Sequence, residues 1–156
     1  MSDRTAEMLA RLEVFVGEWD LEARFPGGGD GPSGGAVAAR SRFGWTLDRQ
    51  FLEQRTEIDL AEAPDGLMIV GPDPETGGYL QHYFDSRGVA RLYTMTFVGR
   101  VWTLTREAAD FTPLEFRQRF IGTFSEDAQT IEGAWETGRD GGPWQHDFAL
   151  TYRRAG

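Results

Sequence analysis

The sequence contains no cysteine and no lysine, so that all 16 basic residues are arginines. The missing cysteines exclude disulfides, thiolate nucleophiles and cysteine metal sites. The missing lysines exclude Schiff-base chemistry and the lysine of a phosphate-binding loop. No apolar stretch approaches the roughly 18 residues of a membrane span, and no basic region followed by an apolar run marks the N-terminus. We therefore expect a soluble, cytoplasmic protein.

The charge of the chain is strongly acidic, with a formal net charge of -9 and a pI near 4.7. Its arginines are scattered one or two at a time, so no basic patch is available for nucleic acid or an anionic membrane. Aromatic residues make up 13% of the chain, which favours a folded core built from large rings. A length of 156 residues predicts one domain spanning residues 1–156.

The hydrophobic pattern predicts one short helix followed by ten strands. Over residues 3–16, apolar side chains recur at helical spacing, and Gly17 ends the helix. From Trp19 onward the period changes to two, which is typical of half-buried strands. The predicted strands cover residues 19–25, 36–46, 52–58, 67–71, 79–84, 89–97, 100–106, 114–124, 129–137 and 144–154.

The order of these strands favours a meander. Apart from the glycine-rich loop after the first strand, the connections are short and hairpin-like. We therefore predict an all-β fold, a closed antiparallel up-and-down β-barrel of about ten strands with a short N-terminal α-helix; a two-sheet sandwich is the alternative. Eight strands are filled by their own side chains, so ten imply a hollow interior.

Both histidines of the chain fall on apolar faces. His146 alternates with Trp144 and Phe148 in the last strand, and His82 alternates with Leu80 and Phe84. Each is explained either as a core histidine bonded to a neighbour or as an inward imidazole that binds iron, zinc or a polar ligand group. The complete predicted ligand-contacting set is His146, His82, Gln54, Gln118, Trp45, Phe43, Phe116, Phe120, Phe148 and Tyr152.

Catalytic signals are weak. Ser86 lies close to His82 but falls in a turn where serine and glycine are expected for turn chemistry alone. The acidic residues mostly take the outward parity, so paired carboxylates would have to come from loops. We name no catalytic residue, expect a protein that is not an enzyme, and expect no metal site outside a haem protein.

The segment Phe15-Val16-Gly17-Glu18-Trp19 resembles the opening signature of calycin barrels, which include lipocalins, fatty-acid-binding proteins and nitrobindin-type proteins. The resemblance implies that Trp19 closes one end of the barrel beneath an arginine from the last strand. Arg154 has the parity to supply that arginine, in a cation-over-ring contact.

The chain resembles two further families, one without an assigned activity and one that binds haem. The run Gly71-Pro72-Asp73-Pro74-Glu75-Thr76-Gly77-Gly78-Tyr79 followed by Tyr83-Phe84-Asp85-Ser86 is similar to a bacterial family that has no assigned activity. The chain also resembles nitrobindins in size and strand number. Nitrobindins bind haem through a histidine on a late strand inside the barrel, which implies His146 as the iron ligand.

Three functional hypotheses follow. In the first, the barrel interior binds a small apolar or amphipathic molecule and needs no cofactor. In the second, the protein is a haem protein with His146 as the proximal ligand. In the third, the interior is filled and the barrel is an interaction scaffold whose outer face forms a homodimer. The first hypothesis requires an interior that is not filled by its own side chains.

Overall fold

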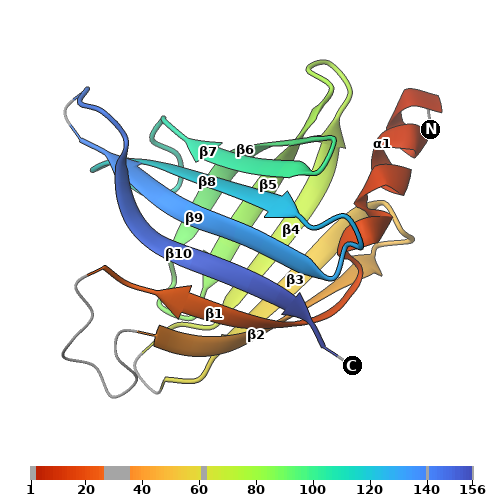
Figure 1. Ribbon diagram of the computed structural model, residues 1–156. Helices are drawn as coiled ribbons and strands as arrows, with labels where there is room; N and C mark the ends of the chain where they lie inside the picture. Colours follow the sequence, from red (N-terminus) through yellow and green to blue (C-terminus); the bar gives the residue numbers. More distant parts are fainter. Residues whose placement is uncertain (1–2, 27–35, 61–62, 140, 156) are drawn as a thin grey trace.

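Ten antiparallel strands close into an up-and-down barrel, which confirms the predicted fold class (Figure 1). The computed structural model describes residues 3–26, 36–60, 63–139 and 141–155. Each strand pairs with its neighbours in the chain, and β1 pairs with β10 to complete the circle. The strands are β1 (Gly17–Arg24), β2 (Ala36–Thr46), β3 (Phe51–Ile58), β4 (Gly66–Asp73), β5 (Gly78–Asp85), β6 (Ala90–Val98), β7 (Val101–Arg106), β8 (Arg117–Phe124), β9 (Thr130–Gly138) and β10 (Gln145–Arg154).

The N-terminal helix closes one end of the barrel. It consists of α1 (Asp3–Arg11) and a 3-10 turn, η1 (Leu12–Phe15), and its apolar face is buried. Phe15 is fully buried, and its ring lies 5.0–5.4 Å from the rings of Phe43, Phe97, Trp102 and Phe124, which belong to four different strands. Aromatic pairs at such distances add to the energy of burial, so Phe15 fixes the helix in the barrel end.

Arg154 ties the helix, the first strand and the last strand together. Trp19 and Arg154 are register partners on β1 and β10, and the guanidinium carbon lies 4.1 Å from the Trp19 ring centroid. The guanidinium donates hydrogen bonds to the carbonyls of Val16 (2.9 Å), Val14 (2.8 Å) and Ala128 (3.1 Å). One side chain therefore satisfies three carbonyls from two distant segments.

Gly17 makes this arrangement sterically feasible. Its φ of +133° is rarely adopted by residues with a side chain, and an added Cβ would lie 2.9 Å from Nη1 of Arg154. In addition, the indole Nε1 of Trp19 donates to the Phe15 carbonyl at 2.9 Å. The Gly-x-Trp motif thus has a physical basis. Gly17 leaves room for the guanidinium of Arg154, and the Trp19 ring lies beneath that guanidinium.

The β2–β3 connection lies at the same end of the barrel. Its residues Leu47, Asp48 and Arg49 have φ values of 51°, 58° and 61°, in the left-handed region. Arg49 lies over the Trp45 ring at 5.0 Å, and Trp45 donates from Nε1 to the Glu13 carboxylate at 2.7 Å. Trp45 therefore stabilises the contact between this turn and the helix.

No helix among the described residues is long and apolar enough to cross a membrane.

Replacing Arg154 by methionine tests the role of its guanidinium. We expect Arg154→Met to lower the free energy of unfolding by about 3 kcal/mol, because three carbonyls lose a charged donor and Trp19 loses a cation. Urea denaturation measures the change. Arg153→Met, at the adjacent exposed position, is the control and should change stability by less than about 0.5 kcal/mol. Equal losses in the two variants would contradict this role.

Candidate functional site

A boundary between buried and accessible side chains crosses the barrel interior. On every strand except β7, an inward side chain near the helix end is buried while an inward side chain nearer the opposite end is only half-buried. On β2 this change occurs between Ser41 and Ala39, and on β10 between Tyr152 and Leu150. We call the accessible set the open half: Ala23, Ala39, Thr56, Met68, Tyr83, Arg91, Gln118, Trp135, Phe148 and Leu150.

One side of the open half is apolar and includes two alanines. Ala23, Ala39 and Leu150 lie next to one another on β1, β2 and β10, with Ala23 paired to Leu150. They occur mid-sheet, where a filled barrel would bury larger side chains. Trp135 on β9 extends this surface and contacts Phe120 at 5.3 Å between ring centroids. Each of these inward side chains is only partly buried.

The floor of the open half is a satisfied polar cluster. Gln54 donates from Nε2 to the Ser41 hydroxyl at 2.8 Å and to the Tyr152 hydroxyl at 3.3 Å, and the Ser41 and Thr56 hydroxyls are 2.8 Å apart. Burial raises the pKa of Tyr152 to about 12. The Tyr152 hydroxyl thus stays protonated near neutral pH, and the cluster serves to satisfy buried polar groups.

The opposite side of the interior carries a second polar cluster, the polar wall, formed by Gln81, Tyr83, Arg91, Tyr93 and Gln118 on β5, β6 and β8. The Tyr93 hydroxyl donates to Oε1 of Gln118 at 3.0 Å, and Nη1 of Arg91 donates to the same oxygen at 3.5 Å. Burial raises the pKa of Tyr93, while its hydrogen bond with Arg91 acts in the opposite direction.

The polar wall is not satisfied. Oε1 of Gln81 and Nε of Arg91 are buried and have no hydrogen-bond partner in the described part of the chain. A third such atom, Nε1 of Trp102, lies in the aromatic half sealed by the helix. Unpaired buried polar atoms are rare and often mark the place of a water or a ligand.

Two ion pairs lie at the rim of the polar wall. Arg106 and Asp110 meet at 2.9 Å, with both side chains buried, and the Asp110 carboxylate also accepts from the backbone N–H of Leu92 at 2.7 Å. Arg106 and the backbone N–H groups of Leu92 and Thr112 hold the pKa of Asp110 well below its usual range. The β7–β8 connection is thereby fixed to β6.

Asp85 forms the second rim pair. Burial alone would raise the pKa of Asp85, but hydrogen bonds from Arg87 and from the Tyr83 hydroxyl outweigh it and lower the pKa to about 2. Burial and the bond to Asp85 together raise the pKa of Tyr83 above its usual value. Both rim carboxylates are therefore already paired with arginine within the protein.

The predicted inward orientation of His146 is wrong. A β-bulge between His146 and Phe148 shifts the register of β10, so that Phe148 pairs with Trp135 and His146 pairs with Glu136. Glu136 lies on the outer surface, where Arg119 binds it at 2.9 Å. The extra residue makes the part of β10 before the bulge face opposite to what simple alternation predicts. His146 therefore lies on the outer face and is exposed to solvent.

The predicted inward orientation of His82 is also wrong. The inner face of β5 carries Tyr79, Gln81 and Tyr83, while His82 lies on the outer face and pairs with Ile69 and Leu92. Both faces of β5 are apolar enough that alternation alone does not distinguish them. The hydroxyl of Tyr79 settles the orientation, because it donates to the Met8 carbonyl beneath the helix at 2.7 Å.

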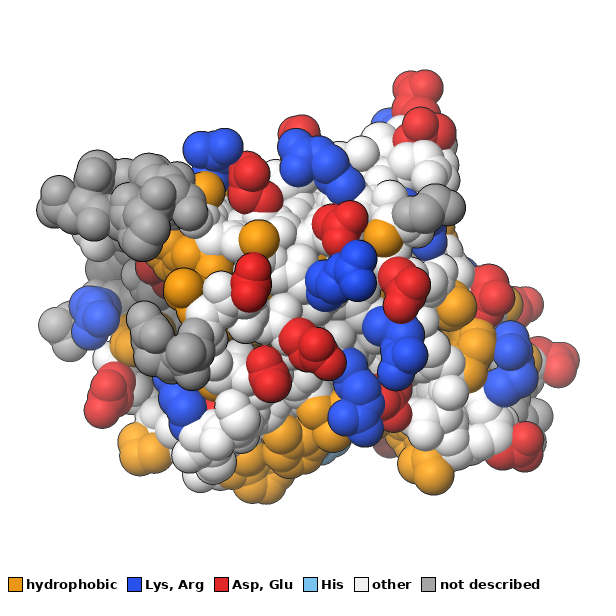
Figure 2. All heavy atoms as spheres, turned by 90° about the horizontal axis from the view of Figure 1, so that it is seen from below, with side chains coloured by type: hydrophobic (Ala, Val, Ile, Leu, Met, Phe, Trp, Pro, Cys, Tyr) orange, Lys and Arg blue, Asp and Glu red, His pale blue; other side chains and the backbone are white. Residues whose placement is uncertain are grey.

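The outer face around His82 is apolar. His82 lies 6.5 Å from the rings of Phe84 and Phe111, which are 39% and 65% exposed. Hydrophobic side chains gather along the lower margin of Figure 2, whose view from below places the back of the barrel there. Pairing of two copies through this face stays a prediction.

The other predicted contact residues are divided among four places. Phe43, Phe120, Gln54 and Tyr152 are buried in the core or in the floor, whereas Gln118 and Phe148 face the open half. Trp45 lies at the helix end. Phe116 precedes β8, which begins at Arg117 rather than at residue 114, and its ring lies beneath Arg139 at 4.7 Å. The barrel thus brings only two of the ten predicted contact residues into the open half.

Sequence reasoning missed Arg91, Tyr93, Tyr83 and Gln81. The signal for the first two was present, since the alternation of Tyr93, Met95 and Phe97 extends back to Arg91. A charged residue at the start of a strand is ordinarily assigned to solvent. The polar wall therefore became visible only from the register of the strands.

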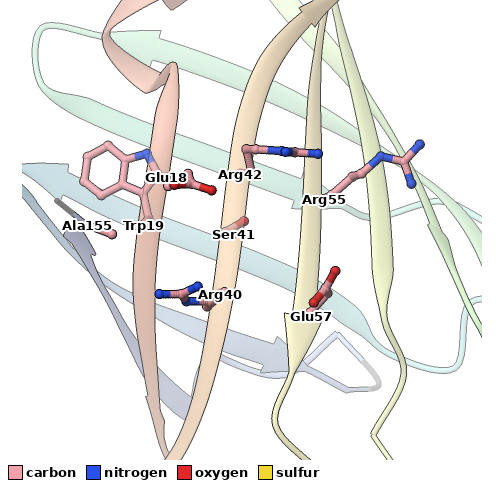
Figure 3. A pocket seen from close by; sticks show the side chains of 8 residues that line it. All are labelled: Glu18, Trp19, Arg40, Ser41, Arg42, Arg55, Glu57 and Ala155. Carbon is pink, nitrogen blue, oxygen red and sulfur yellow. The ribbon is translucent and has the colours of Figure 1, made fainter.

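Two grooves lie on the outside of the barrel. One, of about 190 Å³, crosses β1–β3 and is lined by the charged residues Glu18, Arg40, Arg42, Arg55 and Glu57 (Figure 3). Strand pairing places Glu18 beside Arg42 and Glu57 beside Arg40, and acidic and basic side chains intermix over this part of the surface (Figure 2). The other, of about 360 Å³, lies beside β1, β2 and Arg153. Both are open to solvent, so neither matches an enclosed ligand site.

The described residues do not fit a haem or metal centre. Both histidines point away from the interior, and no group of three or more histidine or carboxylate side chains in the described ranges is arranged to hold a metal ion.

Comparison with known proteins supports the fold. No family model and no curated protein matches the sequence. The chain is similar to the crystal structure of Rv2717c from M. tuberculosis, with a TM-score of 0.64 and 14% sequence identity over 96% of this chain and 98% of that chain. At this identity the similarity shows a shared barrel architecture.

Replacing Asp110 by asparagine tests the Arg106–Asp110 pair. We expect a loss of about 3 kcal/mol near pH 7, because Arg106 stays buried without its counter-charge. The pKa of Asp110 is lower in the folded than in the unfolded chain, so its contribution is complete above the ordinary value of 3.8 and is lost as the pH falls through the folded value.

The measurement is urea denaturation at neutral pH and at about pH 3, where the difference between wild type and Asp110→Asn should shrink. Glu107→Gln, which changes an exposed carboxylate of the same connection, is the control and should stay close to wild type. A difference that is independent of pH would refute the assignment.

Proposed function

We propose that the protein is a binding barrel that holds a small apolar or amphipathic molecule in the open half of its interior. The observation that carries the proposal is the boundary across the barrel, where inward side chains such as Ala39, Leu150 and Trp135 keep contact with solvent. Ligand sites combine an apolar wall with a few polar groups, and the open half has both. A scaffold with a filled core would bury these side chains instead.

We also propose that the chain belongs with the calycin-like barrels. The support is the Gly17-x-Trp19 motif at the start of β1, together with Arg154 over Trp19 at the end of β10. The fold of Rv2717c is consistent with this placement but, at 14% identity, carries no function across. Haem binding through His146 is not proposed, since that side chain lies on the outer surface.

Filling the open half tests the proposal. Nile red, a neutral dye whose fluorescence rises in apolar surroundings, should bind to the wild-type protein. Ala39→Trp places a large ring at an inward, half-buried position, so we expect the dissociation constant of the dye to rise by about tenfold or more. A fluorescence titration gives the constant.

Ala38→Trp is the matched control, because Ala38 is adjacent in the chain but exposed on the outer face. It should bind the dye as the wild type does. Circular dichroism confirms that both variants are folded. Unchanged binding in Ala39→Trp, or weakening in Ala38→Trp alone, would place the dye outside the barrel and contradict the proposal.

A further inference from the structure

We infer that the protein forms a homodimer in which the outer face of β4, β5 and β6 packs against the same face of a second copy. The inference goes beyond the proposed function and is independent of it, because the interior is lined by the opposite faces of these strands. The strand register places nine outward side chains in three rows. We call this set the β4–β6 face: Leu67, Phe84 and Ala90, then Ile69, His82 and Leu92, then Gly71, Leu80 and Thr94.

The first step concerns charge. None of these nine residues is an aspartate, a glutamate or an arginine, and His82 is the one titratable group among them. Charged side chains intermix over β1–β3, whereas hydrophobic ones gather at the back of the barrel (Figure 2). A lack of charge together with aromatic rings is the composition of an interface core. Two outward rows on β1, β2 and β3, in contrast, consist wholly of charged residues: Glu18, Arg42 and Arg55, then Asp20, Arg40 and Glu57.

The second step concerns area. Phe84 is 39% exposed, and two further rings border the face. Phe111, 65% exposed, lies 6.5 Å from the His82 ring, and Phe51, 37% exposed, lies against Gly71. An aromatic side chain has about 150–250 Å² of surface, so these rings expose about 300 Å². One side of a standard interface buries about 800 Å², of which about 500 Å² is apolar. Together with the half-buried apolar residues of the three rows, the face can form the core of a stable dimer.

The third step identifies the partner. Glu53 and Arg55, which border the face on β3, pair with each other and need no counter-charge from another molecule. A charged partner would lose hydration against an apolar face and gain no ion pair there. A second copy supplies an equally large uncharged face. Two copies of a chain with a net charge of -9 also repel one another least where neither carries a charge.

The position of His82 sets the geometry of the pair. A twofold axis is the commonest symmetry of homodimers, and it makes the same patch of both copies meet. His82 is the central residue of the middle row. We therefore expect the two His82 side chains to lie closer together than residues at the edges of the face.

Sedimentation equilibrium tests the dimer. We expect the wild type to dimerise with a dissociation constant of about 10 μM or below, and Phe84→Arg to raise this constant about a hundredfold, because it places a charge in the apolar contact. Ile121→Arg is the matched control, since Ile121 is apolar and 38% exposed on the outer face of β8. It should dimerise as the wild type does, and circular dichroism confirms that both variants are folded.

Cross-linking tests the geometry and keeps the inference testable if Phe84→Arg fails to fold. The chain has no cysteine, so His82→Cys carries a single thiol. A bismaleimide that spans about 10 Å, the spacing of two packed sheets, should link two copies of His82→Cys. Ile121→Cys should give no linked pair at the same protein concentration.

Three results would overturn the inference. The first is a wild-type protein that stays monomeric at about 100 μM. The second is a dimer that Phe84→Arg leaves intact or that is cross-linked through Ile121→Cys alone, because pairing would then use another face. The third is a monomer that binds vesicles of neutral phosphatidylcholine and loses this binding in Phe84→Arg, which would assign the face to a lipid surface.

Discussion

The guanidinium of Arg154 is the contact on which the shape of this barrel depends. It lies 4.1 Å over Trp19 and donates to carbonyls of the helix–β1 segment and of the β8–β9 turn. These bonds join the last strand to the first and fix where the 3-10 turn ends. Phe15 is thereby held inside the barrel, with aromatic rings from four strands around it.

The two ends of the barrel therefore differ. At the helix end, large rings fill the interior, and burial of this apolar surface supplies most of the stability. At the other end, the inward residues of β1 and β2 are alanine or valine, and Phe25, directly after β1, lies 4.9 Å from the Phe148 ring. The interior is therefore sealed at the helix end and accessible at the opposite end. The proposed function depends on this difference between the two ends and requires no catalytic group.

The position of Arg91 follows from the same asymmetry. An unpaired arginine in the sealed half would be prohibitively costly, because a buried charge needs a partner. In the open half, Arg91 is only half-buried and forms hydrogen bonds with Gln118 and Tyr93, so its charge is tolerated there.

The sequence predicted the architecture well, because ten period-two segments and one helical segment can be recognised without knowledge of their partners. The Gly17-x-Trp19 motif also led to Arg154, whose parity on the last strand was clear. Side-chain direction was harder to predict. His146 precedes a bulge that only the pairing with β9 reveals, and His82 lies on a strand with two apolar faces.

The polar wall could not be predicted from alternation for a related reason. Tyr83 and Gln81 share the parity opposite to Leu80 and Phe84, so a rule that places the more apolar face inside assigns them to solvent. Where part of the inner face of a barrel is polar, as on β5, that rule selects the wrong side. Strand register resolves this ambiguity because each residue is tied to a neighbour of known burial.

Thiol labelling tests the central claim, that one half of the interior is open and the other is sealed. The chain has no cysteine, so single cysteines can be introduced without background. In the native protein, Ala39→Cys should react with a small thiol reagent about a hundredfold or more faster than Met95→Cys, which is buried beneath the helix end. Ala38→Cys, on the outer face, sets the rate of full exposure. Equal, slow labelling of Ala39→Cys and Met95→Cys would show that the interior is filled throughout and would contradict a binding barrel.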